Sequence, residues 1–291
     1  IVNSRIAFIE KLLTKDVTKG RITEEQKEAT LANLIPSTDQ HDAADCDLVV
    51  EAIVENMEIK SKVFKNLDEI WVIARRKERL EALAKESRVP LRIFAGDLQK
   101  KKVYKELRDA LEKEQPDLRM LVNSAGFGKS GSVEEILSEK FRIQTDMVDV
   151  NCRSLTRMTL LCLPFLRAGS RIVNLASASA FCPQPYFSVY AATKSYVLSF
   201  SRSLGEELRK KGIVVTAVCP GPVDTEFFNF SGKPQNILKK LTMAKADRVV
   251  HQALKDCRSG KSVSVYGISM KLTYFGTKLL PHGFLVRMQQ I

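Results

Sequence analysis

The sequence predicts an α/β protein with a doubly wound, Rossmann-like parallel sheet. Short apolar runs rich in Val and Ile alternate with amphipathic helical segments between residues 48 and 218. The runs are apolar on both sides, which is typical of strands buried beneath helices on two faces. A chain of 291 residues is long enough for one large α/β domain or for two small ones.

The expected elements follow from apolar spacing. Apolar residues at helical spacing predict helices over 1–15 and 23–34, and Thr23 with Gln26 forms a capping box for the second. The later segments alternate regularly. Predicted strands cover 48–54, 70–74, 91–95, 119–123, 171–175 and 214–218, and predicted helices cover 57–68, 77–86, 102–114, 139–163 and 187–211.

Charge divides the chain into two parts. With 46 Lys and Arg against 34 Asp and Glu, the net charge is +12. Residues 1–70 nevertheless carry a net of −5, and residues 71–291 a net of +17. Such a step suggests segments of different origin. The basic clusters at 75–79 and 100–105 lack interleaved aromatics and any nucleic-acid motif, so we predict no nucleic-acid partner.

Other residue types exclude several function classes. Six cysteines without CxxC spacing and three isolated histidines predict reduced thiols, no metal site and a cytoplasmic protein. Arg157 and Pro164 interrupt the longest apolar stretch, so no transmembrane segment is expected. The apolar and basic tail, 268–291, fits core or interface packing, a substrate lid or a membrane-surface helix.

Catalytic chemistry is indicated by Tyr190 and Lys194, which lie one helical turn apart on one face of a predicted helix. A nearby ammonium favours the phenolate, so we expect Lys194 to lower the pKa of Tyr190. Ser177 follows a predicted strand at the edge where ligands bind in parallel sheets. Its hydroxyl is suited to orient a carbonyl substrate while Tyr190 transfers the proton.

These motifs resemble the short-chain dehydrogenase/reductase family over residues 71–291. LVNSAG at 121–126 is similar to the family's strand-end NNAG, with Ser124 in place of the second Asn. Asn151, the run from Ser177 through the YxxxK helix, and CPGPVDT at 219–225 follow in the family's order. GDL at 96–98 and VIARRKERLEAL at 72–83 are similar to its adenine-side segments.

The resemblance implies an NAD(P)-dependent oxidoreductase acting on a small carbonyl or alcohol, as a homodimer or homotetramer. It implies Tyr190 as general acid/base, Lys194 as its partner and a ribose ligand, Ser177 on the substrate oxygen, and Asn151 in a proton relay. The implied cofactor contacts are Asp97 and Leu98 at the adenine, Asn123, Ala125 and Gly126 in the groove, and Pro220, Gly221, Val223 and Thr225 beside the nicotinamide.

Arg75 and Arg76 follow a predicted strand where an NAD-selective protein places an acidic residue. A guanidinium there pairs with a 2′-phosphate, so we predict NADP(H) rather than NAD(H).

One departure from the family is large. The family opens on a TGxxxGxG turn that cradles the pyrophosphate, but no glycine occurs between Gly20 and Gly96. Residues 1–70 instead resemble the middle of the nucleotide-binding domain of 3-hydroxyacyl-CoA dehydrogenases. We therefore predict two segments, 1–70 and 71–291, with a hybrid strand and helix replacing the family's first βα unit.

In this hybrid, residues 48–54 fill the vacant central strand position and 57–69 form the crossover helix. Glu55 and Glu58 would then face the pyrophosphate and repel it. Two alternatives to an active reductase follow: a hybrid chain that cannot hold the cofactor, and an acyl-CoA-binding remnant.

A second glycine pattern, GFGKSG at 126–131, fits the dinucleotide fingerprint GxGxxG. Asp146, at the fingerprint's distance, falls in a helical pattern and not at a strand end. We therefore interpret 126–131 as a loop after the NSAG motif.

Overall fold

The structure is a computed structural model that forms two compact units, Ile1–Cys46 and Asp47–Ile291. It describes residues 49–52, 68–139, 142–225, 227 and 243–288, with a few positions before residue 30. Within the two helices predicted in the first unit, Thr14, Glu24, Lys27 and Glu28 are described as helical, and Thr23 is described as lying before the second helix. Val17 and Thr18, beyond the predicted end of the first helix, are helical too. The amide of Lys27 donates to the Thr23 carbonyl at 3.0 Å.

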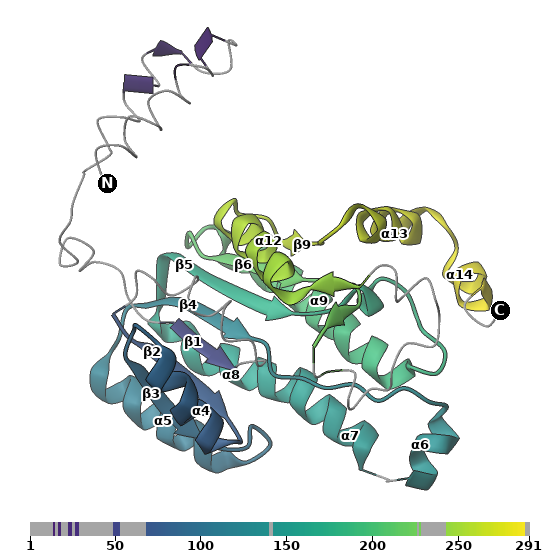
Figure 1. The fold of residues 1–291 in the computed structure, drawn as a ribbon, viewed down its shortest axis with the longest axis horizontal. Helices are drawn as coiled ribbons and strands as arrows, with labels where there is room; N and C mark the ends of the chain where they lie inside the picture. The colour runs from purple at the N-terminus through teal and green to yellow at the C-terminus, as the bar shows by residue number, and fades with distance from the viewer. Residues whose placement is uncertain are drawn as a thin grey trace. The chain divides into compact units, whose positions relative to one another are not determined.

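The second unit is built on a parallel sheet of seven strands with the order β3-β2-β1-β4-β5-β6-β9 (Figure 1). This arrangement confirms the predicted doubly wound α/β fold. The strands are β1 (Val49–Ala52), β2 (Ile70–Ala74), β3 (Leu91–Ala95), β4 (Leu118–Asn123), β5 (Leu166–Leu175), β6 (Val214–Val218) and β9 (Val263–Ser264).

The central strand comes from the segment that replaces the family's first strand. Val50 of β1 pairs with Trp71 of β2 on one side and with Leu121 of β4 on the other, both in parallel. The prediction that this segment fills the vacant position is confirmed. The predicted turn and crossover helix at 54–69 lie outside the described residues, except for Asp68 and Glu69.

Helices cover both faces of the sheet, and the alternation along β2 shows why. Trp71 and Ile73 enter a core cluster with α5 (Lys101–Glu114), α8 (Leu155–Cys162) and α9 (Ser188–Arg209). Ile70 and Val72 point to the opposite face and pack with α4 (Lys77–Glu86). Farther along, α12 (Ala246–Arg258) packs on β5 and β6 through Val249 and Ala253.

The helix predicted over 139–163 is divided. Its described part comprises α7 (Ile143–Val148), a π-helical segment (Asp149–Ser154) and α8. A π segment has wider turns and is often found at functional sites. The remaining described elements are α6 (Val133–Glu139), two 3₁₀ helices (Leu163–Phe165 and Ala178–Ala180), the paired strands β7 (Val223–Asp224) and β8 (Ala244–Lys245), and the terminal helices α13 (Ile268–Leu279) and α14 (His282–Met288).

Candidate active site

Ser177 lies two residues beyond β5, at the carboxyl edge of the sheet. It caps a 3₁₀ turn (Ala178–Ala180), where its hydroxyl accepts a hydrogen bond from the Ser179 amide at 3.1 Å. The backbone amide of Ala178, the residue that follows Ser177, donates a hydrogen bond to the carbonyl of Pro220, which lies beyond β6, at 2.8 Å. The ends of β5 and β6 are thereby tied together beside the Ser177 side chain.

Tyr190 and Lys194 project from the same buried face of α9, as predicted. The Lys194 Nζ lies 5.7 Å from the centre of the Tyr190 ring and donates to the Leu175 carbonyl at 2.7 Å. The Ser177 hydroxyl lies close enough to the Tyr190 phenol to favour its ionised form. The chain therefore brings the three predicted side chains into one group.

Burial sets the protonation of this group. Loss of hydration raises the pKa of Tyr190 to about 12, a shift that the neighbouring Ser177 hydroxyl opposes. Burial also lowers the pKa of Lys194 to about 8. The predicted lowering of the phenol pKa is therefore not met by the protein's own groups, because desolvation outweighs the effect of the Ser177 hydroxyl.

Asn151 lies in the π-helical segment and is almost fully buried. Its amide nitrogen donates to the Phe127 carbonyl at 2.9 Å and to the Thr193 hydroxyl at 3.0 Å. Its amide oxygen accepts from the Phe127 amide at 3.0 Å. Asn151 thus joins the loop after β4 to the α9 turn that carries Lys194.

Two glycines let the loop after β4 cross this group closely. A Cβ on Gly126 would lie 2.8 Å from Asn151 Oδ1 and 3.4 Å from Lys194 Nζ. A Cβ on Gly128 would lie 2.8 Å from the Tyr190 ring. These close contacts account for Gly126 and Gly128 without a dinucleotide fingerprint. Asp146, the acidic residue at the fingerprint's distance, lies in helix α7 and not at the end of a strand.

Asn123 ends β4 but is turned into the interior. Its amide donates to Asn174 Oδ1 at 2.8 Å and to the Thr159 hydroxyl at 3.1 Å, and Asn174 donates to Ser201 at 2.9 Å. This network fixes β4, β5, α8 and α9 together. The neighbouring Ala125 lies in the half-buried loop between Asn123 and Gly126.

The predicted adenine-side residues lie at the carboxyl ends of β2 and β3. Arg75 and Arg76 are exposed and precede α4, with Arg76 at its N-cap. Asp97 accepts from the Gln99 amide at 2.9 Å, and the Leu98 carbonyl accepts from the Ser154 hydroxyl at 3.0 Å.

The segment after β6 borders the same edge. Pro220 is joined to the Ser177 turn as described above, and Val223 pairs with Ala244 in the β7–β8 ribbon. Thr225 accepts a hydrogen bond from the Phe227 amide at 3.4 Å. Met270 of α13 lies against Gly221, where an added Cβ would be 2.6 Å from its sulfur.

Some neighbours of Tyr190 were not predicted. Phe187 stacks on its ring with centroids 4.3 Å apart, and the Phe227 ring is tilted at 5.5 Å. Thr193 donates to the Tyr190 carbonyl at 2.7 Å and also holds Asn151. Thr193 directly precedes Lys194 in the YAATK run. Its polar side chain on the buried face of the helix was the sequence signal that could have identified it as part of the site.

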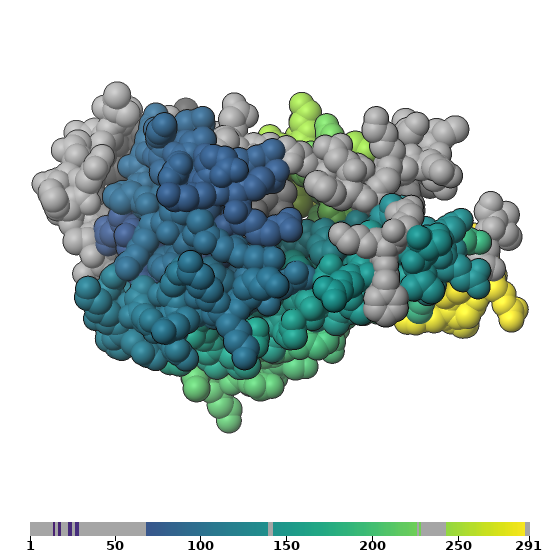
Figure 2. Space-filling model, turned by 90° about the horizontal axis from the view of Figure 1, so that it is seen from below, coloured from purple at the N-terminus to yellow at the C-terminus, as the bar shows by residue number. Residues whose placement is uncertain are grey.

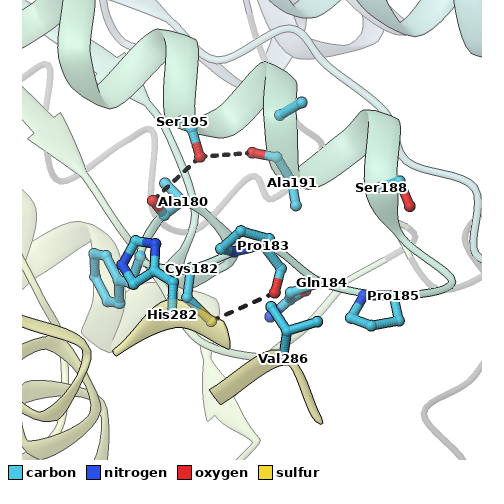
Figure 3. A pocket seen from close by; sticks show the side chains of 12 residues that line it. Ala180, Cys182, Pro183, Gln184, Pro185, Ser188, Ala191, Ser195, His282 and Val286 are labelled. Atoms are coloured by element: carbon cyan, nitrogen blue, oxygen red, sulfur yellow. Dashed lines mark hydrogen bonds between the residues drawn. The ribbon is translucent and has the colours of Figure 1, made fainter. Parts of the chain in front are cut away.

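A cavity of about 560 Å³ lies on a neighbouring face of α9 (Figure 3). Its walls come from the loop after Ser177, the first turns of α9, and α14. They include Cys182, Gln184, Ser188, Ala191, His282 and Val286. Tyr190 and Ser177 are not lining residues, so this cavity is separate from the group that they form. Within the described ranges, no three potential metal ligands gather.

The parallel sheet and the Ser-Tyr-Lys group at its carboxyl edge define a Rossmann-like oxidoreductase. The sequence profile described as short chain dehydrogenase matches residues 56–236. This match covers more than half of the chain, which therefore belongs to the short-chain dehydrogenase family. A second profile, the NAD binding domain of 3-hydroxyacyl-CoA dehydrogenase, matches residues 1–74.

Known proteins show the same likeness. An uncharacterized oxidoreductase of Staphylococcus epidermidis is 30% identical over 169 residues, which are 57% of this chain and 72% of that protein. The 17-beta-hydroxysteroid dehydrogenase type 3 of Mus musculus is 28% identical over 192 residues, 64% of this chain and 60% of the relative. Some relatives are thus matched over less than two thirds of their length.

Among solved structures, a short-chain dehydrogenase from Sphingobium yanoikuyae in complex with NADPH superposes with a TM-score of 0.66. It is 22% identical, and the match covers 82% of this chain and 95% of that one. At 22% sequence identity, this structural similarity establishes the shared fold alone.

Proposed function

We propose that this chain is an NADP(H)-dependent oxidoreductase that interconverts a small carbonyl compound and its alcohol, with Tyr190 as the general acid/base. The observation that carries the proposal is the buried group of Ser177, Tyr190 and Lys194. A buried lysine and tyrosine beside a serine hydroxyl are costly to maintain without a role, and shifted pKa values are typical of functional sites.

In the reducing direction, Ser177 donates a hydrogen bond to the substrate oxygen and holds it beside the phenol. Tyr190 is protonated at neutral pH because burial raises its pKa to about 12. It gives its proton to the oxygen as negative charge develops there. Lys194 supplies positive charge behind the phenol as the phenolate forms. Asn151 holds the loop and helix in register.

A bound nicotinamide cofactor supplies or accepts the hydride. The residues at its nicotinamide end fit such a group, because Gly126 leaves the space beside Lys194 and Asn151 that a side chain would fill. In this proposal Lys194 and Tyr190 hold the ribose. Asn123, Ala125 and Gly126 line the groove, Pro220, Gly221, Val223 and Thr225 border the nicotinamide, and Asp97 and Leu98 contact the adenine.

The preference for NADP(H) rests on Arg75 and Arg76. Both are exposed at the carboxyl end of β2, where the 2′-phosphate of a bound cofactor would lie. We expect Arg75→Ala/Arg76→Ala to shift the NADPH-to-NADH preference by about tenfold toward NADH. Cofactor titrations measure this ratio. Arg88→Ala, which removes an exposed arginine two residues beyond the C-terminal end of α4, is the matched control; an equal shift there would reject the assignment.

The proton-transfer role is tested by Tyr190→Phe, which keeps the ring and removes the hydroxyl. We expect turnover with a carbonyl substrate to fall about 100-fold or more, since general acid catalysis contributes at least that much. Tyr196→Phe is the control: it lies in the same helix, and its hydroxyl meets Thr156 at 2.8 Å. Similar turnover for both variants would mean that Tyr190 is not the acid.

A second candidate is a hybrid chain that keeps the site but does not hold the cofactor. It is favoured by the absence of glycine between Gly20 and Gly96, which leaves a Cβ on every residue from β1 through the end of β3. NADPH titration followed by melting temperature separates the two. No shift at millimolar cofactor supports the hybrid, whereas a saturable shift supports the enzyme. An acyl-CoA-binding remnant would show its shift with coenzyme A thioesters instead.

A cytoplasmic location, a homodimer or homotetramer, and the division at residues 70 and 71 stay predictions. Analytical ultracentrifugation tests the assembly.

A further inference from the structure

The two terminal helices expose an apolar surface that the proposed reaction does not use. In Figure 1, α13 and α14, in yellow, lie outside the layers of sheet and helix. Ile268, Leu272, Phe275 and Leu279 of α13 recur at helical spacing and are 60–83% exposed. They form one continuous stripe along the helix.

The opposite side of α13 is anchored to the protein. Tyr274 packs against Phe181 with ring centroids 4.8 Å apart, and Met270 lies against Gly221. The exposed stripe is therefore not the side by which α13 packs on the rest of the protein. The helix already buries one apolar side and presents a second.

Helix α14 repeats this arrangement. His282 and Val286 face inward and line the cavity beside α9 (Figure 3). Phe284 and Met288, on the other side, are 53% and 56% exposed. Figure 2 shows the C-terminal residues, in yellow, at the surface of the molecule.

Charge identifies the partner. Residues 257–291 contain no Asp or Glu and five cations, Arg258, Lys261, Lys271, Lys278 and Arg287. Lys271 and Lys278 are seven residues apart and follow one flank of the stripe, and both are exposed. A helix with an apolar stripe bordered by lysines is typical of one that lies in the headgroup region of a bilayer.

A second copy of the chain fits this surface less well. A two-fold contact through the stripe would bring the lysines of both copies together, and the segment offers no carboxylate to pair with them. The described helices also include none long and apolar enough to cross a bilayer. The uniformly positive charge of the segment favours adsorption onto an anionic surface.

We propose that the exposed stripe of α13, with Phe284 and Met288 of α14, docks the protein onto a membrane rich in anionic lipid. Met270 connects α13 to Gly221 at the border of the candidate active site. Docking therefore places that border close to the lipid surface, where an apolar substrate would be concentrated.

Vesicle sedimentation of the full chain tests the proposal. We expect binding to phosphatidylcholine vesicles that contain phosphatidylglycerol, and little binding to pure phosphatidylcholine. Leu272→Ser/Phe275→Ser should weaken binding about tenfold or more, because two buried apolar side chains are lost. Lys271→Gln/Lys278→Gln should weaken it about fivefold per charge.

Leu137→Ser and Leu160→Ser remove exposed leucines from α6 and α8 and are the matched controls. Melting temperatures confirm that each variant is folded. Failure of the unaltered chain to bind anionic vesicles would overturn the proposal, as would equal binding by the Leu272→Ser/Phe275→Ser variant. A dimer that this variant dissolves, without vesicle binding, would assign the stripe to a second copy instead. Binding only to an acidic protein would also overturn it.

Discussion

At the scale of single residues, the unusual feature is a lysine held in the interior. Lys194 is 4% exposed, and its one described hydrogen bond goes to the Leu175 carbonyl. A buried ammonium loses most of its hydration, so the folded state prefers the neutral amine. The stability of the protein should consequently depend on pH through this residue.

Burial lowers the pKa of Lys194 from its ordinary value of 10.5 to about 8. Below pH 8 the amine is charged in both the folded and the unfolded state, so folding bears the full free-energy cost of burying the ammonium. Between about pH 8 and 10.5 the unfolded chain binds more protons, so stability rises with pH. Relative to Lys194→Met, the native chain should gain about 3 kcal/mol over this window.

Urea unfolding of both chains at pH 7 to 10.5 measures the difference, and Lys113→Met, at an exposed site on α5, controls for the substitution itself. A pH-independent difference between Lys194→Met and the native chain would show that the ammonium is not desolvated.

Spacing alone predicted the grouping of Tyr190, Lys194 and Ser177, because helical turns and strand ends fix which side chains meet. It did not predict Phe187 stacked on the phenol or the close passage of Gly128. Those contacts depend on how a loop crosses the helix, which no local pattern records. The net effect of burial on Tyr190 was also missed, since desolvation depends on everything packed around the ring.

At the scale of elements, β1 is the most informative strand. It lies between β2 and β4, so its backbone amides have strand partners on both sides. Val50→Pro removes one of these donors and leaves a carbonyl unpaired inside the sheet, which should cost about 2–4 kcal/mol. Urea unfolding of the full chain measures this loss.

Val50→Ala keeps the amide and is the control for the side chain. If the proline variant is no less stable than the alanine variant, β1 does not have central pairing.

Apolar runs located the strands well because burial on two faces demands a short, continuous apolar segment. Strands β2, β3 and β6 have the predicted bounds, and β5 begins earlier, at Leu166. The π-helical segment at Asp149–Ser154 was not predicted, because a single wide turn leaves the apolar spacing nearly unchanged. The role of the segment that forms α13 and α14 could not be decided from the sequence, because an apolar stripe that faces solvent or lipid has the same spacing as one that faces a core.

At the scale of the whole molecule, the sequence indicated two origins, yet strands from both segments share the seven-stranded sheet. Residues 1–74 match the NAD binding domain of 3-hydroxyacyl-CoA dehydrogenase, yet β1 from that stretch pairs with strands of the short-chain dehydrogenase part. A short apolar strand of suitable length fills a central position whatever its source, because backbone pairing and burial are its main requirements.

The position of β1 also bears on how the chain matures on the ribosome. Its partner β4 ends at Asn123, about seventy residues later. At roughly 5–20 residues per second, β1 waits about 4–14 s with one edge uncovered. An apolar edge left open for seconds recruits other chains. Yield in cells should therefore respond to translation speed and chaperone supply more steeply than the stability of the finished protein would suggest.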